Sequence, residues 1–87
     1  MRRTKPIVYS AHAREVMLQR LLPAEFVERT VQSPDWSEAD PTQEDAERRF
    51  LALPERDGRV LRVAVVETES EVRIITAFLD RRARRRE

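Results

Sequence analysis

The 87-residue sequence predicts a single α+β domain in which two helices lie on one face of an antiparallel sheet. Three observations lead to this prediction. Apolar residues recur at helical spacing over 11–31, and a period of two replaces that spacing from residue 48 onward. Asp57-Gly58 is a strong hairpin signal that joins two of the expected strands. The predicted element order is therefore β-α-α-β-β-β.

The first strand and first helix are expected within residues 7–22. Residues 7–9 form a short β-rich run after Pro6, and Ser10 is a favourable N-cap for the helix that follows. Leu22-Pro23 is expected to end this helix, because the residue before a proline avoids the helical region. Arg20 falls inside the apolar stripe of the predicted helix, where a guanidinium is unexpected.

The second helix is expected to begin at Pro23 and to stop at Ser33-Pro34. Its predicted apolar face consists of Phe26, Val27, Thr30 and Val31. Residues 34–46 are polar and contain prolines, and they are predicted to form a long loop that Trp36 attaches to the core.

The main sheet is predicted from three strands. In residues 48–53 the alternation directs two sets of side chains to opposite faces, namely Arg48, Phe50 and Ala52 against Arg49, Leu51 and Leu53. The strands at 60–66 and 72–79 are rich in β-branched residues and apolar on both faces. Both faces therefore need cover. The helices supply one cover, and a partner, a tail or a ligand is expected on the other.

The composition excludes several classes of site. The chain has no cysteine, a single histidine and a single glycine. It therefore offers no disulfide framework, no zinc site and no glycine loop for a nucleotide, and we expect neither metal nor cofactor. No apolar run approaches the roughly 20 residues that span a bilayer, so a cytoplasmic protein without a membrane partner is expected.

The net charge of +1 conceals a segregation of charge along the chain. Residues 1–5 form a basic arm and residues 80–87 a basic tail, on either side of the single domain at 6–79. Basic ends of this kind often contact polyanions such as RNA. The alternative is that they are solvated ends without a partner.

His12 and Arg20 are the candidate catalytic residues. His12 lies at a predicted helix N-terminus, where anions are favoured, and a neutral imidazole exchanges protons near pH 7. Metal-free RNA cleavage needs such a group together with a cation for the phosphate. Alternatively, His12 forms a hydrogen bond that fixes the corner between strand and helix. Arg20 is either an anion clamp or a structural residue, which pairs with a carboxylate such as Glu47 or caps exposed carbonyls.

A second group of polar residues is predicted to bind RNA or phosphate: Ser10, Arg49, Arg62, Arg73 and Thr76. Ser10 belongs to the helix N-terminus, and the others interrupt apolar strands. The strand register decides which of them share a face. One register sets Arg62 opposite Thr76 with Arg73 on the other face, whereas a shift by one residue brings Arg62 and Arg73 together. Positions at a sheet edge explain the same residues without a ligand.

The order of short motifs resembles that of a known family. The motifs are Tyr9-Ser10-Ala11-His12-Ala13, then Met17 and Arg20, a second helix reading PAEFV, a Ser33-Pro34-Asp35 stop and a terminal Ile75-Thr76-Ala77-Phe78 strand. They resemble the small prokaryotic domain-of-unknown-function family 4258. Val16 stands where that pattern usually has an arginine. A site that needs two helix arginines would therefore be incomplete in this chain.

The family is similar in fold to the RelE and BrnT toxins. The resemblance implies a metal-independent endoribonuclease, or mRNA interferase, whose open sheet face is covered by an antitoxin protein. Two alternatives stand beside this hypothesis: a non-catalytic module that binds RNA or a protein, and a homodimer that buries its sheet face.

Overall fold

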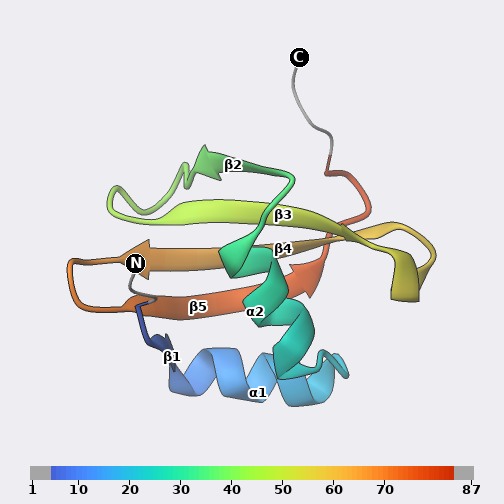
Figure 1. Cartoon of the computed structure of the whole chain (residues 1–87), viewed down its shortest axis with the longest axis horizontal. Helices are drawn as coiled ribbons and strands as arrows, with labels where there is room; N and C mark the ends of the chain where they lie inside the picture. The colour runs from blue at the N-terminus through green and yellow to red at the C-terminus, as the bar shows by residue number, and fades with distance from the viewer. Residues whose placement is uncertain (1–4, 84–87) are drawn as a thin grey trace, which may run out of the picture.

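The computed structural model describes residues 5–83, which form a five-stranded mixed sheet with two helices (Figure 1). The elements are β1 (Ile7–Tyr9), α1 (Ala11–Gln19), α2 (Ala24–Gln32), β2 (Trp36–Ala39), β3 (Glu47–Leu53), β4 (Arg59–Glu67) and β5 (Val72–Leu79). This architecture confirms the predicted α+β class. None of the helices in the described residues is long and apolar enough to cross a membrane.

The strands lie in the order β1-β5-β4-β3-β2. β1 pairs with β5 in parallel, and the other neighbours are antiparallel. The fourth antiparallel strand, β2, was not predicted, because it lies within the segment 34–46 that was expected to be a loop. Four residues are too few for alternation to predict a strand, and β2 forms because it pairs along the edge of β3.

The β3–β4 hairpin closes at Asp57-Gly58, as the sequence predicted. Both residues have positive φ, +58° at Asp57 and +76° at Gly58. Aspartate tolerates this region and glycine adopts it without steric cost. Pro54 ends β3 and opens one short 3₁₀ turn, Pro54–Arg56, before the hairpin closes.

One face of the sheet is covered by α2, which crosses β3 and β4 (Figure 1). The four residues of its predicted apolar face are all buried. They pack against buried side chains of the three central strands: Leu53, Leu61, Val63, Val65, Val72, Ile74 and Ala77. Thr30 is the buried polar residue of this core, and its hydroxyl donates to the carbonyl of Phe26, so no polar group is left unpaired there.

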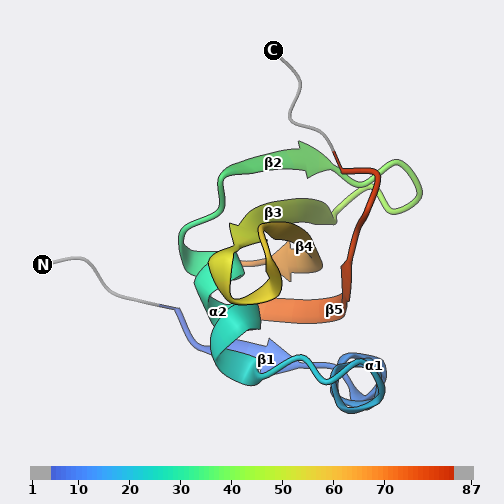
Figure 2. The same ribbon diagram turned by 90° about the vertical axis from the view of Figure 1, so that its right-hand side faces the viewer.

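α1 lies along the edge of β5 rather than across the sheet, so the two helices do not share one face (Figure 2). β1 pairs with residues 72–74 of β5 only, and α1 continues past the rest of that strand. The helix ends at Gln19, three residues before the predicted end at Leu22. Arg20 therefore follows the helix as an exposed C-cap, and its expected position in the apolar stripe was wrong.

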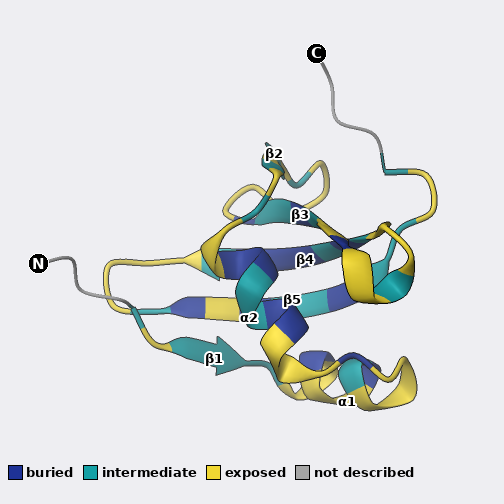
Figure 3. Cartoon of the chain, turned by 45° about the vertical axis from the view of Figure 1, so that its right-hand side comes forward, coloured by how far each residue is buried: buried dark blue, intermediate teal, exposed yellow. Residues whose placement is uncertain are grey.

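No helix of residues 5–83 lies over the second face of the sheet (Figures 2 and 3). We call it the open face. A β-bulge affects which residues reach it: Val65 pairs with Ile74 and Ala64 with Thr76, which leaves Ile75 as an extra residue in β5. Because of this residue, both Arg73 and Thr76 belong to the open face together with Arg62. The register that sets Arg62 opposite Thr76 was therefore wrong, because Arg62 pairs with Phe78. The register shifted by one residue matches only residues 72–74 of β5, where Val66 pairs with Arg73.

Candidate functional site

The open face carries two rows of cross-strand neighbours. The first row consists of Trp36 in β2, Phe50 in β3, Arg62 in β4 and Phe78 in β5. The second row consists of Glu38, Arg48, Ala64 and Thr76 on the same four strands. Such neighbours on one face have Cβ atoms roughly 5 Å apart, so their side chains interact. Aromatic rings and guanidinium groups thus meet on one surface.

The aromatic side chains of the first row are ordered by stacking. The rings of Trp36 and Phe50 have centroids 4.6 Å apart and planes inclined by 4°. Phe50 is almost fully buried, whereas Trp36 in the edge strand keeps part of its surface exposed. Trp36 therefore offers an aromatic surface to a ligand at the edge of the sheet.

Arg62 is held at the centre of the open face. Its guanidinium carbon lies 4.0 Å from the ring centroid of Phe78, and its Nη1 lies 3.1 Å from Asp80 Oδ2. Burial and the like charge of nearby Arg48 lower the pKa of the Arg62 guanidinium, and the carboxylate of Asp80 opposes this effect. Arg48 in turn lies 3.5 Å from Asp40 Oδ2. Two guanidinium groups therefore repel each other across a small space.

That space is a hollow of about 290 Å³ between the open face and the segment that follows β5. It is lined by Glu38, Arg48, Phe50, Arg62, Asp80, Arg82 and Ala83. Each guanidinium group has five N–H donors, and Asp40 and Asp80 occupy only part of those of Arg48 and Arg62. The remaining donors can bind an anion beside the floor that Phe50 provides.

Ser10 and Arg20 are both used to cap the free edge of β5. Ser10 Oγ accepts from the amide of Ala13 as the N-cap of α1, and donates to the carbonyl of Ile75 at 3.2 Å. Arg20 Nη1 donates to the carbonyl of Ala77 at 3.0 Å. These carbonyls lie beyond the last pair of β1 with β5, so they have no strand partner on that side. The carbonyl-capping alternative for Arg20 matches this geometry, and no contact with Glu47 is present.

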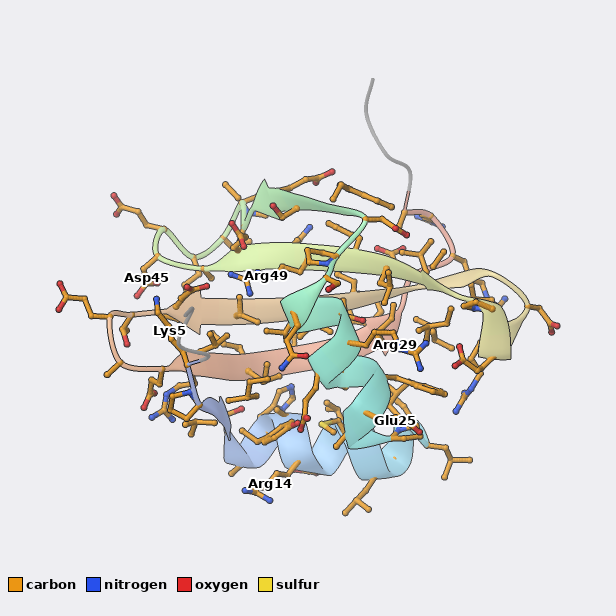
Figure 4. The ribbon with its side chains drawn as sticks, in the orientation of Figure 1. Lys5, Arg14, Glu25, Arg29, Asp45 and Arg49 are labelled. Atoms are coloured by element: carbon orange, nitrogen blue, oxygen red, sulfur yellow. The ribbon has the colours of Figure 1, made fainter. Side chains whose placement is uncertain are left out.

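Arg49 lies on the helix-covered side of the sheet and is absent from the open face. Its guanidinium donates to Glu47, to Glu67 and to the carbonyl of Val31 at the end of α2. Lys5 also binds Glu67, and Figure 4 shows Lys5 and Arg49 at the same end of the sheet. The hydrogen bonds from Lys5 and Arg49 lower the pKa of the Glu67 carboxyl. Arg49 thus joins α2 to β3 and β4.

Two further predicted residues, Arg73 and Thr76, do lie on the open face. Thr76 belongs to the second row, opposite Ala64. Arg73 pairs with Val66, four residues from Arg62, which places it about 13 Å further along the sheet. Its guanidinium lies 3.2 Å from Glu71. Neither Thr76 nor Arg73 lines the hollow, and Arg73 lies toward the opposite end of the face.

His12 is not gathered with the arginines. It is an exposed residue in the first turn of α1, and its imidazole has no hydrogen bond or ion pair with any residue of 5–83. Arg20 follows the other end of the same helix, about 12 Å further along the axis at 1.5 Å per residue. The structure thus separates the two candidate catalytic residues.

Sequence reasoning missed Trp36 and Asp80 as members of the candidate site, chose Arg49 instead of Arg48, and expected Arg82 only as part of the basic tail. The alternation in β3 places Arg48 with Phe50 and Arg49 with Leu51 and Leu53, but both sets are apolar, so it does not show which face the helix covers. Trp36 was missed because β2 was expected to be a loop. In residues 5–83 no group of three or more side chains is arranged to hold a metal ion.

Comparison with known proteins gives one match. The model of a domain of unknown function, DUF4258, matches residues 9–79, from the end of β1 to the end of β5. No curated protein and no solved structure matches the chain. The expected similarity to the RelE and BrnT toxins therefore stays a prediction.

Proposed function

We propose that this chain, which belongs to the family of domains of unknown function DUF4258, is a module that binds single-stranded RNA on the open face. The proposal rests on the geometry of that face. The observation that carries the proposal is the first row, in which Trp36 stacks on Phe50 and Arg62 lies between Phe50 and Phe78. This row lies beside a hollow whose charged lining residues are Arg48, Arg62, Arg82, Glu38 and Asp80. Proteins bind single strands by stacking bases on aromatic rings and by tracking phosphates with basic side chains.

The two parts of this surface suit different parts of a nucleotide. The exposed side of Trp36 is a stacking position for a base at the edge of the sheet. The hollow next to it contains the free donors of Arg48 and Arg62, which are aligned by Asp40 and Asp80. Guanidinium groups bind phosphate oxygens in a fork-like geometry, so the hollow is suited to a phosphate.

Arg82 adds a basic group from the segment after β5 and lines the same hollow. The rest of the basic tail predicted at 80–87 continues from there, and residues 84–87 lie outside the described part of the chain, as does most of the arm predicted at 1–5. A polyanion bound in the hollow would therefore extend toward the segment that follows β5.

Catalysis by His12 and Arg20 is not the function that this geometry favours. The two residues are separated along α1, and Arg20 is bound to the Ala77 carbonyl. The endoribonuclease hypothesis therefore depends on His12, which is exposed and forms no hydrogen bond or ion pair with residues 5–83. An antitoxin over the open face would compete with RNA for the same residues.

The test is the binding of a fluorescently labelled RNA strand of roughly ten nucleotides, measured by anisotropy at several salt concentrations without metal. We expect salt-sensitive binding by the wild type and weaker binding by Arg62→Gln, while the RNA remains uncut. RNA cleavage that is lost in His12→Ala would instead establish the endoribonuclease. Retention of full affinity in a folded Arg62→Gln variant would contradict binding through the open face.

A further inference from the structure

The outer side of α1 and the turn after it expose two leucines. Leu18 is 79% and Leu21 76% exposed, and they are the strongly exposed large apolar side chains of residues 5–83. The positive φ of Leu21, +53°, belongs to the C-terminal cap of α1, in which the amide of Leu21 donates to the Leu18 carbonyl and that of Leu22 to the Met17 carbonyl. The exposure of two large apolar side chains so close together is what suggests contact with another molecule.

A groove lies beside Leu18, which is one of its lining residues. It has a volume of about 430 Å³ and is lined by Tyr9, Arg14, Met17, Leu18, Leu22 and Ala24. Its walls are mostly apolar and come from β1, α1 and the start of α2. A protruding leucine thus stands next to a groove that accepts an apolar side chain. This is the arrangement that a twofold contact between identical surfaces requires.

The charges at the ends of this surface have opposite signs. Arg14 lies toward the N-terminal part of α1, and Glu25 lies at the start of α2, near the other end of α1 (Figure 4). Arg14 is four residues before Leu18, and Glu25 is four residues after Leu21. Neither charge forms an ion pair within residues 5–83, although Arg14 lies over the ring of Tyr9.

We propose that a second copy of this chain docks on this surface about a twofold axis, with the two α1 helices antiparallel. In this arrangement Leu21 of one copy enters the groove of the other beside Leu18, and Arg14 of one copy faces Glu25 of the other. Along the sequence this surface presents a positive charge, two leucines and a negative charge. When a second copy lies antiparallel, each charge meets the opposite charge and each leucine meets a leucine. A partner of uniform acidic or basic character would match only one end of this surface.

This contact is independent of the proposed RNA surface. It involves α1, the turn after it and the start of α2, whereas the RNA surface lies on β2 to β5. Dimerisation by this route therefore leaves both open faces accessible. The homodimer considered from sequence buries its sheet face, so the two arrangements predict different effects of the same variants.

The test is the molar mass in solution, measured by sedimentation equilibrium over increasing protein concentration. The wild type is expected to rise from the monomer mass of 10.3 kDa toward twice that value. Leu21→Gly removes the side chain and also suits the positive φ, so it should abolish the dimer without lowering the thermal midpoint of the monomer. Leu18→Glu should abolish the dimer as well.

Reversing the two charges, singly and together, provides a second test of the dimer. Arg14→Glu and Glu25→Arg should each weaken dimerisation, and the double variant should restore it, because the two charges then face each other with reversed signs. Arg59→Glu, at the exposed start of β4, is the control that should leave the mass unchanged. A wild type that remains monomeric throughout, a dimer that persists in Leu21→Gly, or a double variant without recovery would each overturn the proposal.

Discussion

The guanidinium of Arg62 lies over the ring of Phe78, its cross-strand neighbour on the open face, with 4.0 Å between the guanidinium carbon and the ring centroid. Arg20 approaches the same ring from the end of α1, at 5.7 Å. A partly buried cation over an aromatic ring is worth on the order of 1 kcal/mol. This contact and the ion pair with Asp80 orient Arg62 before any ligand arrives, so the open face is organised in the free protein.

Replacing Arg62 by lysine should separate orientation from charge. Arg62→Lys keeps the positive charge but loses the planar group that lies on Phe78 and binds Asp80. We expect a loss of about 1 kcal/mol in the free energy of unfolding and several-fold weaker RNA binding. Urea denaturation and anisotropy titration measure the two effects. Unchanged affinity in the lysine variant would show that charge alone suffices at this position.

The neighbours Arg48 and Arg49 form a matched pair, because one lies on each face of β3. Arg48→Met should lower the slope of log affinity against log salt by about 0.7, the value for one phosphate contact on a single strand, with little change in stability. Arg49→Met breaks hydrogen bonds to Glu47, Glu67 and the Val31 carbonyl. It should cost about 2–3 kcal/mol of unfolding free energy and leave RNA binding unchanged. If Arg49→Met weakened RNA binding and Arg48→Met did not, RNA would bind the helix-covered face and the proposed surface would be contradicted.

The caps on the edge of β5 predict stability effects for two residues that were expected to bind anions. Ser10→Ala removes a helix N-cap and a bond to the Ile75 carbonyl, and should cost about 1–2 kcal/mol. Arg20→Met removes the bond to the Ala77 carbonyl and should cost about 1 kcal/mol. Thermal and urea unfolding measure both.

His12→Ala is the control for these variants, since it lies on the same helix without a partner among the described residues. It should change stability by less than about 0.5 kcal/mol. A large loss in this variant would show instead that His12 has a structural role.

Stability should decrease in acid partly through Glu67. Hydrogen bonds from Lys5 and Arg49 lower the pKa of its carboxyl in the folded protein, whereas the unfolded value is about 4.3. The stabilisation is therefore complete above that value and is lost as the pH falls below it toward the folded pKa. Because Glu67 is partly exposed to solvent, the effect should stay below about 1 kcal/mol. Glu67→Gln should flatten this acid limb, and Glu69→Gln, in the exposed turn nearby, should not.

Much of the fold could be predicted from local patterns. The apolar face of α2, the Asp57-Gly58 hairpin and the alternation in β3 all depend on residues close in sequence, and the structure confirms each. The bulge at Ile75 could not be predicted, because it arises from pairing with β4. The bulge brings Arg73 and Thr76 to one face, which no straight strand allows for residues three apart.

The candidate site was predicted less well, for physical reasons. Helical spacing extended past Gln19 predicts a core position for Arg20, but α1 ends at Gln19. Trp36 reaches the open face through β2, and this short strand is defined by its pairing with β3. Arg62 and Thr76 were recognised because they interrupt otherwise apolar strands. Choosing Arg48 over Arg49 required knowing which face the helix covers.

The central claim, that the open face binds single-stranded RNA, is tested most directly by amide NMR of the ¹⁵N-labelled protein titrated with a short RNA strand. We predict shift changes concentrated in β2, β3, β4 and the end of β5, around Trp36, Arg48 and Arg62, and a change at the indole N–H of Trp36. The chain has one tryptophan, so that signal is unambiguous. Shift changes confined to α1 around His12, or none at saturating RNA, would contradict the claim.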